Sequence, residues 1–229
     1  RAGRMEAILK ELEGKYEFIE PEPASEEDLK RVHSQGHIES IKRNPRLYEI
    51  ACLSAGGAIL AAELAIKGEP SFALIRPPGH HASYDSCWGF CFFNNIAVAL
   101  AKLKAENKIK SALILDIDLH FGDGTANIFR GTEIKYFHPE AYTPEVFLEL
   151  IKKKLEEENY DILAVSAGFD RGVEDWGDFL SLEDYYNIGK LVKQFSEKIC
   201  QGKRFAVLEG GYNHQVLGKH VKAFIEGLS

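Results

Sequence analysis

Three side chains with metal-binding chemistry follow one apolar run in this sequence. Residues 112–125 read ALILDIDLHFGDGT, and Asp116, Asp118 and His120 are spaced two apart within them. The apolar, β-branched start is typical of a buried parallel strand, and alternate side chains on an extended backbone project to one side. An aspartate at a strand end can also cap the next helix. Three donors in register favour a metal site over capping.

Polar side chains follow three further apolar runs. His80 and His81 come after one run, Asp170 after another and Tyr212 after the last. Taken singly, these could be loop histidines, a capping aspartate and a packed tyrosine with a bonded hydroxyl. In a parallel sheet, however, all strands end at one edge, where ligands bind. Their shared edge favours a functional site.

The residue types at this edge indicate a metal-dependent reaction. Asp118, His120 and Asp170 offer three ligands and leave positions open for water and substrate. Two carboxylates with one imidazole suit Zn²⁺ or Fe²⁺.

The two adjacent histidines are interpreted as acid/base groups and not as further ligands. Asp116 and Asp123 are available to bond the far nitrogen of each imidazole, which would fix its tautomer. This interpretation pairs His80 and His81 with carboxylate partners.

Strand and helix patterns alternate along the chain and predict a single-domain α/β fold with a doubly wound parallel sheet flanked by helices. His33 and His37 lie four apart, but Gly36 interrupts that helix, so surface histidines are expected there. Strands are expected at residues 16–19, 71–75, 111–116, 133–137, 161–167 and 204–208. Helices are expected at residues 4–13, 28–33, 37–42, 48–67, 94–106, 144–158, from 181 to about 200, and at the end to 228.

Length and composition are those of an ordinary globular chain. One domain over residues 1–229 is expected, with an incomplete N-terminus because the chain begins at Arg1. A net charge of −7 argues against direct nucleic-acid or anionic-membrane binding. No apolar run approaches the ~18 residues of a membrane span. Four cysteines without paired spacing indicate free thiols in a reducing compartment, and a cytoplasmic location.

The motifs RPPGHHA, GFCFFNN, DIDLHFGDGT, AGFD and EGGYN together resemble the zinc-dependent histone deacetylases and their prokaryotic acetylpolyamine amidohydrolase relatives. The early stretch RAGRMEAILKEL is also similar to a helix of that family, so the resemblance covers nearly the whole chain. Glu209 and the pair Gly168–Phe169 lean towards the class II and prokaryotic branch. The resemblance implies an arginase/deacetylase-type α/β fold with one catalytic metal.

The resemblance also implies roles for individual residues, and allows a monovalent cation such as K⁺ beneath the metal. Implied are metal ligands Asp118, His120 and Asp170, paired histidines His80 and His81 with carboxylate partners Asp116 and Asp123, the oxyanion-binding Tyr212, and substrate-binding Gly89, Phe90 and Phe169.

The sequence departs from the family pattern at three places. Residues 42–51 lack the acidic loop residue that holds the substrate backbone, and KYFHPEAYTP replaces a Ser-X-His segment and a Pro-Gly loop. Phe121 replaces a usual histidine. These departures concern the channel rim and the monovalent-cation site, and leave the catalytic set intact.

The sequence therefore predicts a metal-dependent amidohydrolase that removes acetyl from acetyl-lysine, an acetylpolyamine or a similar acetylated amine. His81 is the predicted general base and then acid, with His80 as its electrostatic partner. An arginase-type ureohydrolase is one alternative, although SAGFD offers one aspartate where two manganese ions need more. A non-catalytic module that binds acetylated ligands is another. The oligomeric state stays open.

Overall fold

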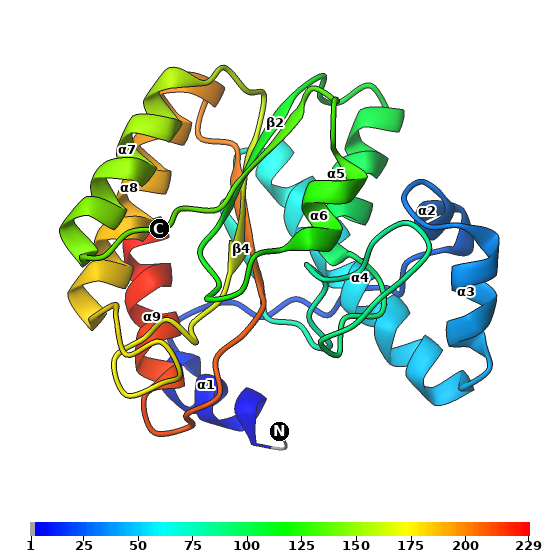
Figure 1. Cartoon of the computed structure of the whole chain (residues 1–229), viewed down its shortest axis with the longest axis horizontal. Coiled ribbons are helices and arrows are strands. Elements are labelled where there is room, and N and C mark those ends of the chain that lie inside the picture. Colours follow the sequence, from blue (N-terminus) through cyan, green and yellow to red (C-terminus); the bar gives the residue numbers. More distant parts are fainter. Residues whose placement is uncertain (1–2) are drawn as a thin grey trace.

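Five parallel strands form one sheet through the middle of the molecule (Figure 1). The computed structural model describes residues 3–229. The spatial order is β1-β5-β4-β2-β3, and every neighbouring pair is parallel. The strands are β1 (Ser71–Ala73), β2 (Ala112–Asp116), β3 (Ile134–Phe137), β4 (Leu163–Ala167) and β5 (Arg204–Leu208).

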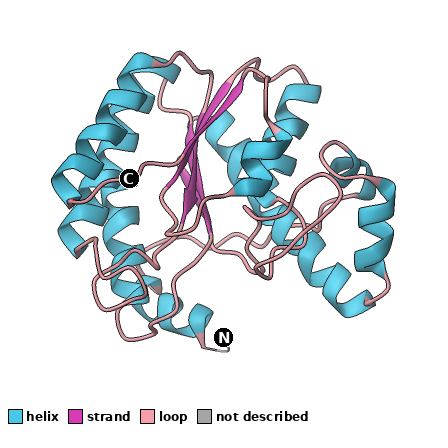
Figure 2. Ribbon diagram, viewed as in Figure 1, coloured by secondary structure: helices cyan, strands magenta, loops and turns pink. Residues whose placement is uncertain are grey.

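Helices cover both faces of this sheet, which confirms the predicted α/β fold (Figure 2). They are α1 (Arg4–Leu12), α2 (Glu26–Lys30), α3 (Gln35–Lys42), α4 (Pro45–Ile66), α5 (Asn95–Ala105), α6 (Asp123–Ile128), α7 (Pro144–Glu157), α8 (Leu182–Cys200) and α9 (Leu217–Leu228). Along β2, Ile114 packs with α2–α5, whereas Leu113 and Leu115 pack with α1 and α7–α9. This alternation gives the sheet two apolar cores.

The direction of winding reverses between the neighbouring strands β2 and β4. From β2 the chain passes through α6 to β3 at one edge, and from β4 it passes through α8 to β5 in the opposite direction. The helices α6 and α8 pack on opposite faces. Doubly wound sheets bind ligands at such a reversal, beyond the carboxyl ends of the strands. The predicted ligands Asp118 and Asp170 follow these two strands.

The predicted elements differ from the structure at a few places. Residues 16–19, expected as a strand, form a loop, and helix α6 was not expected. Helix α4 also corrects the expectation about apolar runs, because it is long and apolar enough, by length and composition alone, to cross a membrane. Core helices pass the same test, and 61% of its apolar window is buried inside the protein.

His33 and His37 were expected at the surface, and this expectation is wrong. Their exposed fractions are 1% and 5%. Both rings pack around Phe93. His33 Nδ1 donates to the Ser83 carbonyl oxygen at 2.8 Å, and its Nε2 accepts from the Asn94 N–H at 2.9 Å. The helix interruption at Gly36 thus turns both imidazoles inward, where they brace the segment that carries the later catalytic loop.

This burial predicts acid-sensitive stability. Burial and the neighbouring His37 lower the pKa of His33 to about 4, because a proton on Nε2 would face the Asn94 N–H. The unfolded state therefore binds more protons below the ordinary value of about 6.5, and His33 contributes stability that is lost as pH falls from there through 4. The contribution is about 3 kcal/mol.

Urea unfolding of the wild type and of His33→Gln between pH 4 and 7.5 measures this contribution. The difference in unfolding free energy between the two proteins should shrink as pH falls. A difference that does not change with pH would contradict the prediction.

Candidate active site

The backbone bends directly after β2, and this bend sorts the three polar residues into two groups. The strand ends at Asp116, so the predicted extended alternation through His120 is wrong. The Asp118 N–H donates to Asp116 Oδ1 at 3.0 Å, and the His120 N–H donates to Asp118 Oδ1 at 2.9 Å. Asp116 consequently faces His80, while Asp118 and His120 turn towards the end of β4.

Asp118, His120 and Asp170 come together as predicted. One donor atom from each lies within 4.8 Å of the others. His120 Nδ1 is 3.2 Å from Asp118 Oδ1 and 3.0 Å from Asp170 Oδ2. Both carboxylates are buried, whereas the imidazole is partly exposed on the side open to solvent. The arrangement provides two oxygens and one nitrogen around an accessible point.

The hydrogen bonds of the two carboxylates leave one oxygen unused. Asp118 Oδ2 accepts from the Gly210 N–H at 2.8 Å, and Asp170 Oδ1 accepts from the Leu119 N–H at 3.0 Å. Asp170 Oδ2 is buried and accepts no hydrogen bond from any residue in the described range 3–229. A buried carboxylate oxygen without a donor is costly. It fits a metal ligand.

The charges of this group also fit a cation. Burial, followed by the adjacent Asp118, raises the pKa of Asp170 to about 6. Hydrogen bonds to Asp118 and Asp170 raise the pKa of His120 to about 10. A proton on His120 therefore neutralises the two carboxylates, and a divalent metal would displace that proton.

Two glycines make room for the carboxylates. A Cβ atom at Gly210 would lie 2.6 Å from Asp118 Oδ2 and 2.8 Å from Asp170 Oδ2. A Cβ atom at Gly168 would lie 2.2 Å from Asp118 Oδ2. Side chains at either position would occupy the space of the ligand oxygens. The glycines of AGFD and EGGYN thus have a steric role at the site.

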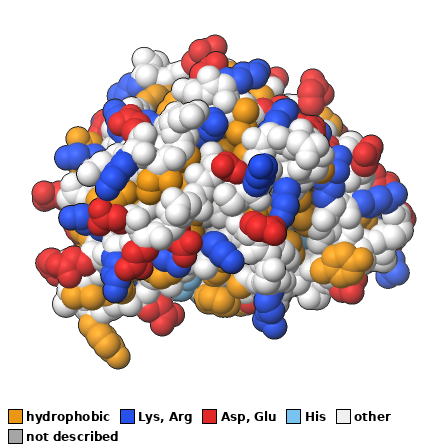
Figure 3. Space-filling view, turned by 90° about the horizontal axis from the view of Figure 1, so that it is seen from above, with side chains coloured by type: hydrophobic (Ala, Val, Ile, Leu, Met, Phe, Trp, Pro, Cys, Tyr) orange, Lys and Arg blue, Asp and Glu red, His pale blue; other side chains and the backbone are white. Residues whose placement is uncertain are grey.

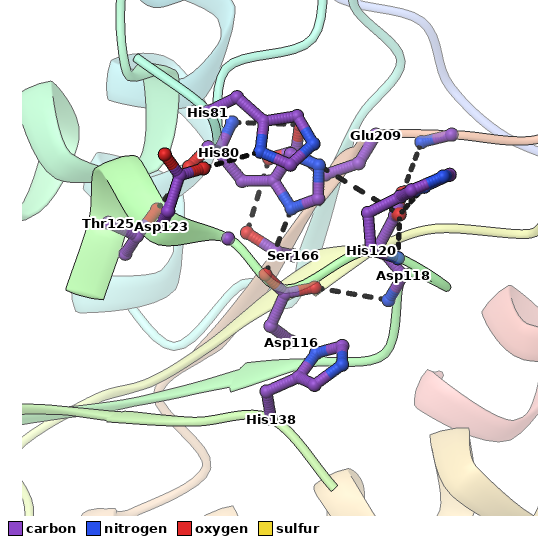
Figure 4. Close-up of polar contacts among 12 residues, drawn as sticks. His80, His81, Asp116, Asp118, His120, Asp123, Thr125, His138, Ser166 and Glu209 are labelled. Carbon is purple, nitrogen blue, oxygen red and sulfur yellow. Dashed lines mark hydrogen bonds and ion pairs between the residues drawn. The ribbon is translucent and has the colours of Figure 1, made fainter. Parts of the chain in front are cut away.

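The two predicted histidine–carboxylate pairs are present (Figure 4). His80 Nδ1 lies 3.0 Å from Asp116 Oδ2, and His81 Nδ1 lies 2.6 Å from Asp123 Oδ1. His80 Nε2 points towards Asp118, 3.8 Å from its Oδ1. Because each Nδ1 is held by an acid, each Nε2 is directed to the metal group.

The environments of these imidazoles push their pKa values apart. Burial opposes charge on His80, but Asp118 and Asp116 outweigh it and raise the pKa of that residue. Burial, and then the charge on His80, lower the pKa of His81. His81 is consequently neutral at neutral pH beside a cationic His80. This difference suits a base with an electrostatic partner.

Trp88 and Glu209 support the histidines, and neither role was predicted. The Trp88 indole stacks on His81 with ring centroids 3.8 Å apart, and its N–H donates to Asp123 Oδ2 at 3.0 Å. Glu209 Oε2 accepts from the N–H groups of Gly79 and His80 at 2.8 and 3.2 Å. The only sequence signal for Glu209 was its position directly after an apolar strand.

Tyr212 lies in the same region. Its ring stacks on Trp176 with centroids 4.2 Å apart, and the Arg4 guanidinium lies 5.5 Å from its centroid. Burial, followed by the charges of Asp118 and Asp170, raises the pKa of the Tyr212 phenol. The phenol stays protonated and is able to donate.

The three predicted substrate-binding residues divide. Gly89 and Phe90 form a turn with φ values of 61° and 60°, and a Cβ at Gly89 would lie 2.7 Å from His81 Cδ2. Phe90 is 83% exposed at the rim. Phe169, however, is 0% exposed and packs on Phe72 and other core aromatic rings. The expectation that its side chain contacts substrate is wrong.

A second group of possible ligands, His80, Cys91 and Glu209, is fully buried behind the first. The Glu209 oxygens already accept three hydrogen bonds, including one from Ser166 Oγ at 3.2 Å. Burial raises the pKa of the Cys91 thiol well above its ordinary value. The Asp118, His120 and Asp170 group is the better metal site.

Comparison with known proteins agrees with this site. A family model described as the histone deacetylase domain matches residues 1–137 and 134–228. The chain belongs to the histone deacetylase family. It is 32% identical to a protein named "Probable deacetylase" from Methanothermobacter thermautotrophicus, over 99% of this chain and 84% of that protein.

Two further relatives extend the comparison. A histone deacetylase-like amidohydrolase from Pseudomonas aeruginosa is 30% identical, over 90% of this chain and 69% of that protein. The crystal structure of the HDA15 HD domain has a TM-score of 0.86 at 25% identity, covering 98% of this chain and 80% of that one. Membership in this family supports an enzyme that hydrolyses acetylated amines.

Proposed function

We propose that this deacetylase uses one Zn²⁺ or Fe²⁺ ion held by Asp118, His120 and Asp170. The observation that carries the proposal is the buried, unsatisfied Asp170 Oδ2 beside the other two donors. The bound ion would polarise the amide carbonyl and make its water more acidic. The donor set fits zinc or ferrous iron better than Mg²⁺ or Ca²⁺, because one ligand is an imidazole.

The protein groups would handle the protons. His81 Nε2, held in position through the Asp123 bond, takes a proton from the attacking water and returns it to the departing amine. His80 stays cationic and stabilises the negative charge that develops on the substrate carbonyl. The Tyr212 hydroxyl donates a hydrogen bond to the same oxygen. Breaking the C–N bond then gives acetate and the free amine.

Tyr212→Phe tests the oxyanion role, since it removes a hydroxyl and keeps the ring on Trp176. We expect kcat to fall roughly 10²-fold or more, the usual loss for one oxyanion donor, with metal content and melting temperature kept. Steady-state kinetics on the zinc-loaded variant measure it. Tyr142→Phe, which alters an exposed tyrosine, is the control. Turnover of Tyr212→Phe close to wild type would contradict the assignment.

The proposed substrate class is an acetylated amine, either an acetyl-lysine side chain or an acetylpolyamine. Acidic and basic side chains are interspersed on the face drawn in Figure 3, which supports no direct nucleic-acid partner. We further propose a reducing, cytoplasmic location, supported by four free cysteines.

The arginase-type alternative needs ligands for a second metal ion. Asp116 is the nearest candidate, but its Oδ2 already binds His80 and accepts from the Tyr136 hydroxyl at 2.8 Å. Its Oδ1 accepts from the Asp118 N–H. These bonds favour a single metal.

An acetate-release assay on an acetyl-lysine peptide and on an N-acetylated polyamine tests the proposal. We expect turnover of at least one substrate by zinc- or iron-loaded protein, and none after metal removal. Binding of both substrates without acetate release would favour the non-catalytic module.

A further inference from the structure

A buried arginine lies directly behind the metal group. Arg171 follows the ligand Asp170 in sequence and is 7% exposed. Its Nε donates to the Asp118 carbonyl oxygen at 2.9 Å. Its Nη2 donates to His138 Nε2 at 2.9 Å and to the Pro139 carbonyl oxygen at 3.4 Å. The guanidinium thereby joins the loop after β2 to the segment after β3.

The partners of Arg171 do not neutralise it locally. In the described residues they are two carbonyl oxygens and an imidazole nitrogen, and the guanidinium carbon lies 5.1 Å from the centre of the Phe147 ring. A buried charge needs compensation. The buried carboxylates Asp116, Asp118 and Asp170 on the other side of the loop supply it.

A monovalent cation beneath the metal, which the family resemblance allowed, would need the same atoms. Alkali ions bind oxygen, and the Asp118 carbonyl faces the space between the two segments. Arg171 already fills that space and supplies both charge and hydrogen bonds. The residues present therefore do not fit an added K⁺ at this position.

We propose that Arg171 is a built-in cation that positions the 118–120 ligand loop in place of a monovalent ion, so that this protein does not depend on K⁺. The role is positioning, since the guanidinium contacts the backbone of a ligand and not the substrate. It rests on the proposed metal centre, but it is tested without turnover.

The experiment measures thermal unfolding of zinc-loaded protein in KCl, NaCl or choline chloride at one ionic strength. The wild type should have the same midpoint in all three salts. Arg171→Ala should unfold at a lower temperature and gain about 2–4 °C in KCl over choline chloride, a shift typical of one modest interaction in a chain of this size. Arg171→Lys, which keeps the charge, should stay independent of K⁺.

Chemical rescue separates charge from packing. Millimolar guanidinium should raise the midpoint of Arg171→Ala, and should restore the visible spectrum of its Co²⁺-loaded form. Urea, a neutral molecule of similar shape, should do neither. The control is Arg204→Ala, another buried arginine, which binds the Leu228 carbonyl at the start of β5. That variant should lose stability and keep the Co²⁺ spectrum.

Specific stabilisation of the wild type by K⁺ would overturn the proposal. So would an Arg171→Ala protein that responds to no cation, or that responds equally to urea. If Arg171→Ala cannot be purified folded, the wild-type and Arg171→Lys salt series decide. Absence of deacetylase activity in the wild type would instead refute the proposed function, and would leave these thermal results interpretable.

Discussion

Asp170→Asn is expected to lose the bound metal and to reduce turnover to the background rate. Asp170 is one of three ligands, and its Oδ2 is the oxygen that accepts no hydrogen bond. An amide at this position keeps the size of the side chain but removes the negative charge, so the ion loses both a ligand and a counter-charge. Elemental analysis after dialysis and an acetate-release assay measure the two losses.

Asp178→Asn is the matched control. This aspartate lies in the same loop, is exposed, and accepts from the Glu174 N–H at 3.0 Å. Its variant should keep one metal per chain. An Asp170→Asn protein that also keeps one metal per chain would show that the ion is held elsewhere.

His81→Ala is expected to lower kcat by about 10² to 10⁴, the usual range for a general acid or base, and to keep its metal. His81 is held by Asp123 and Trp88 but does not belong to the ligand group. His214→Ala, which changes an exposed histidine, should retain wild-type kcat. A fully active His81→Ala enzyme would mean that another group transfers the proton.

The same residue sets the acid side of the pH–rate profile. Burial and the adjacent His80 lower the pKa of His81, and only the neutral imidazole accepts a proton. Wild-type kcat/KM should therefore fall as pH drops through a value below the ordinary 6.5 of histidine. This acid limb should be absent from the residual activity of His81→Ala.

The strands and the residues at their ends could be predicted from the sequence, because apolar runs and chain order fix both. The parallel sheet and the meeting of Asp118, His120 and Asp170 follow from those patterns. The bend after Asp116 could not be predicted, since it depends on hydrogen bonds from the backbone N–H groups of Asp118 and His120 to preceding carboxylates.

Residues whose roles depend on long reach were also missed. Arg171 and Trp88 act through side chains that extend to another segment, and neither has a local pattern that indicates its partner. Phe169 stands beside a ligand in sequence, yet its ring turns into the core. His33 and His37 were misassigned for a related reason, because their acceptor and donor groups lie about 50 residues away.

The metal content of the active protein tests the central claim most directly. The purified chain, loaded and then dialysed, should hold one Zn²⁺ or Fe²⁺ ion per chain, release acetate from an acetylated amine, and be inhibited by a hydroxamate that binds the open positions of that ion. Two manganese ions per chain, with hydrolysis of arginine and no deacetylation, would contradict the account.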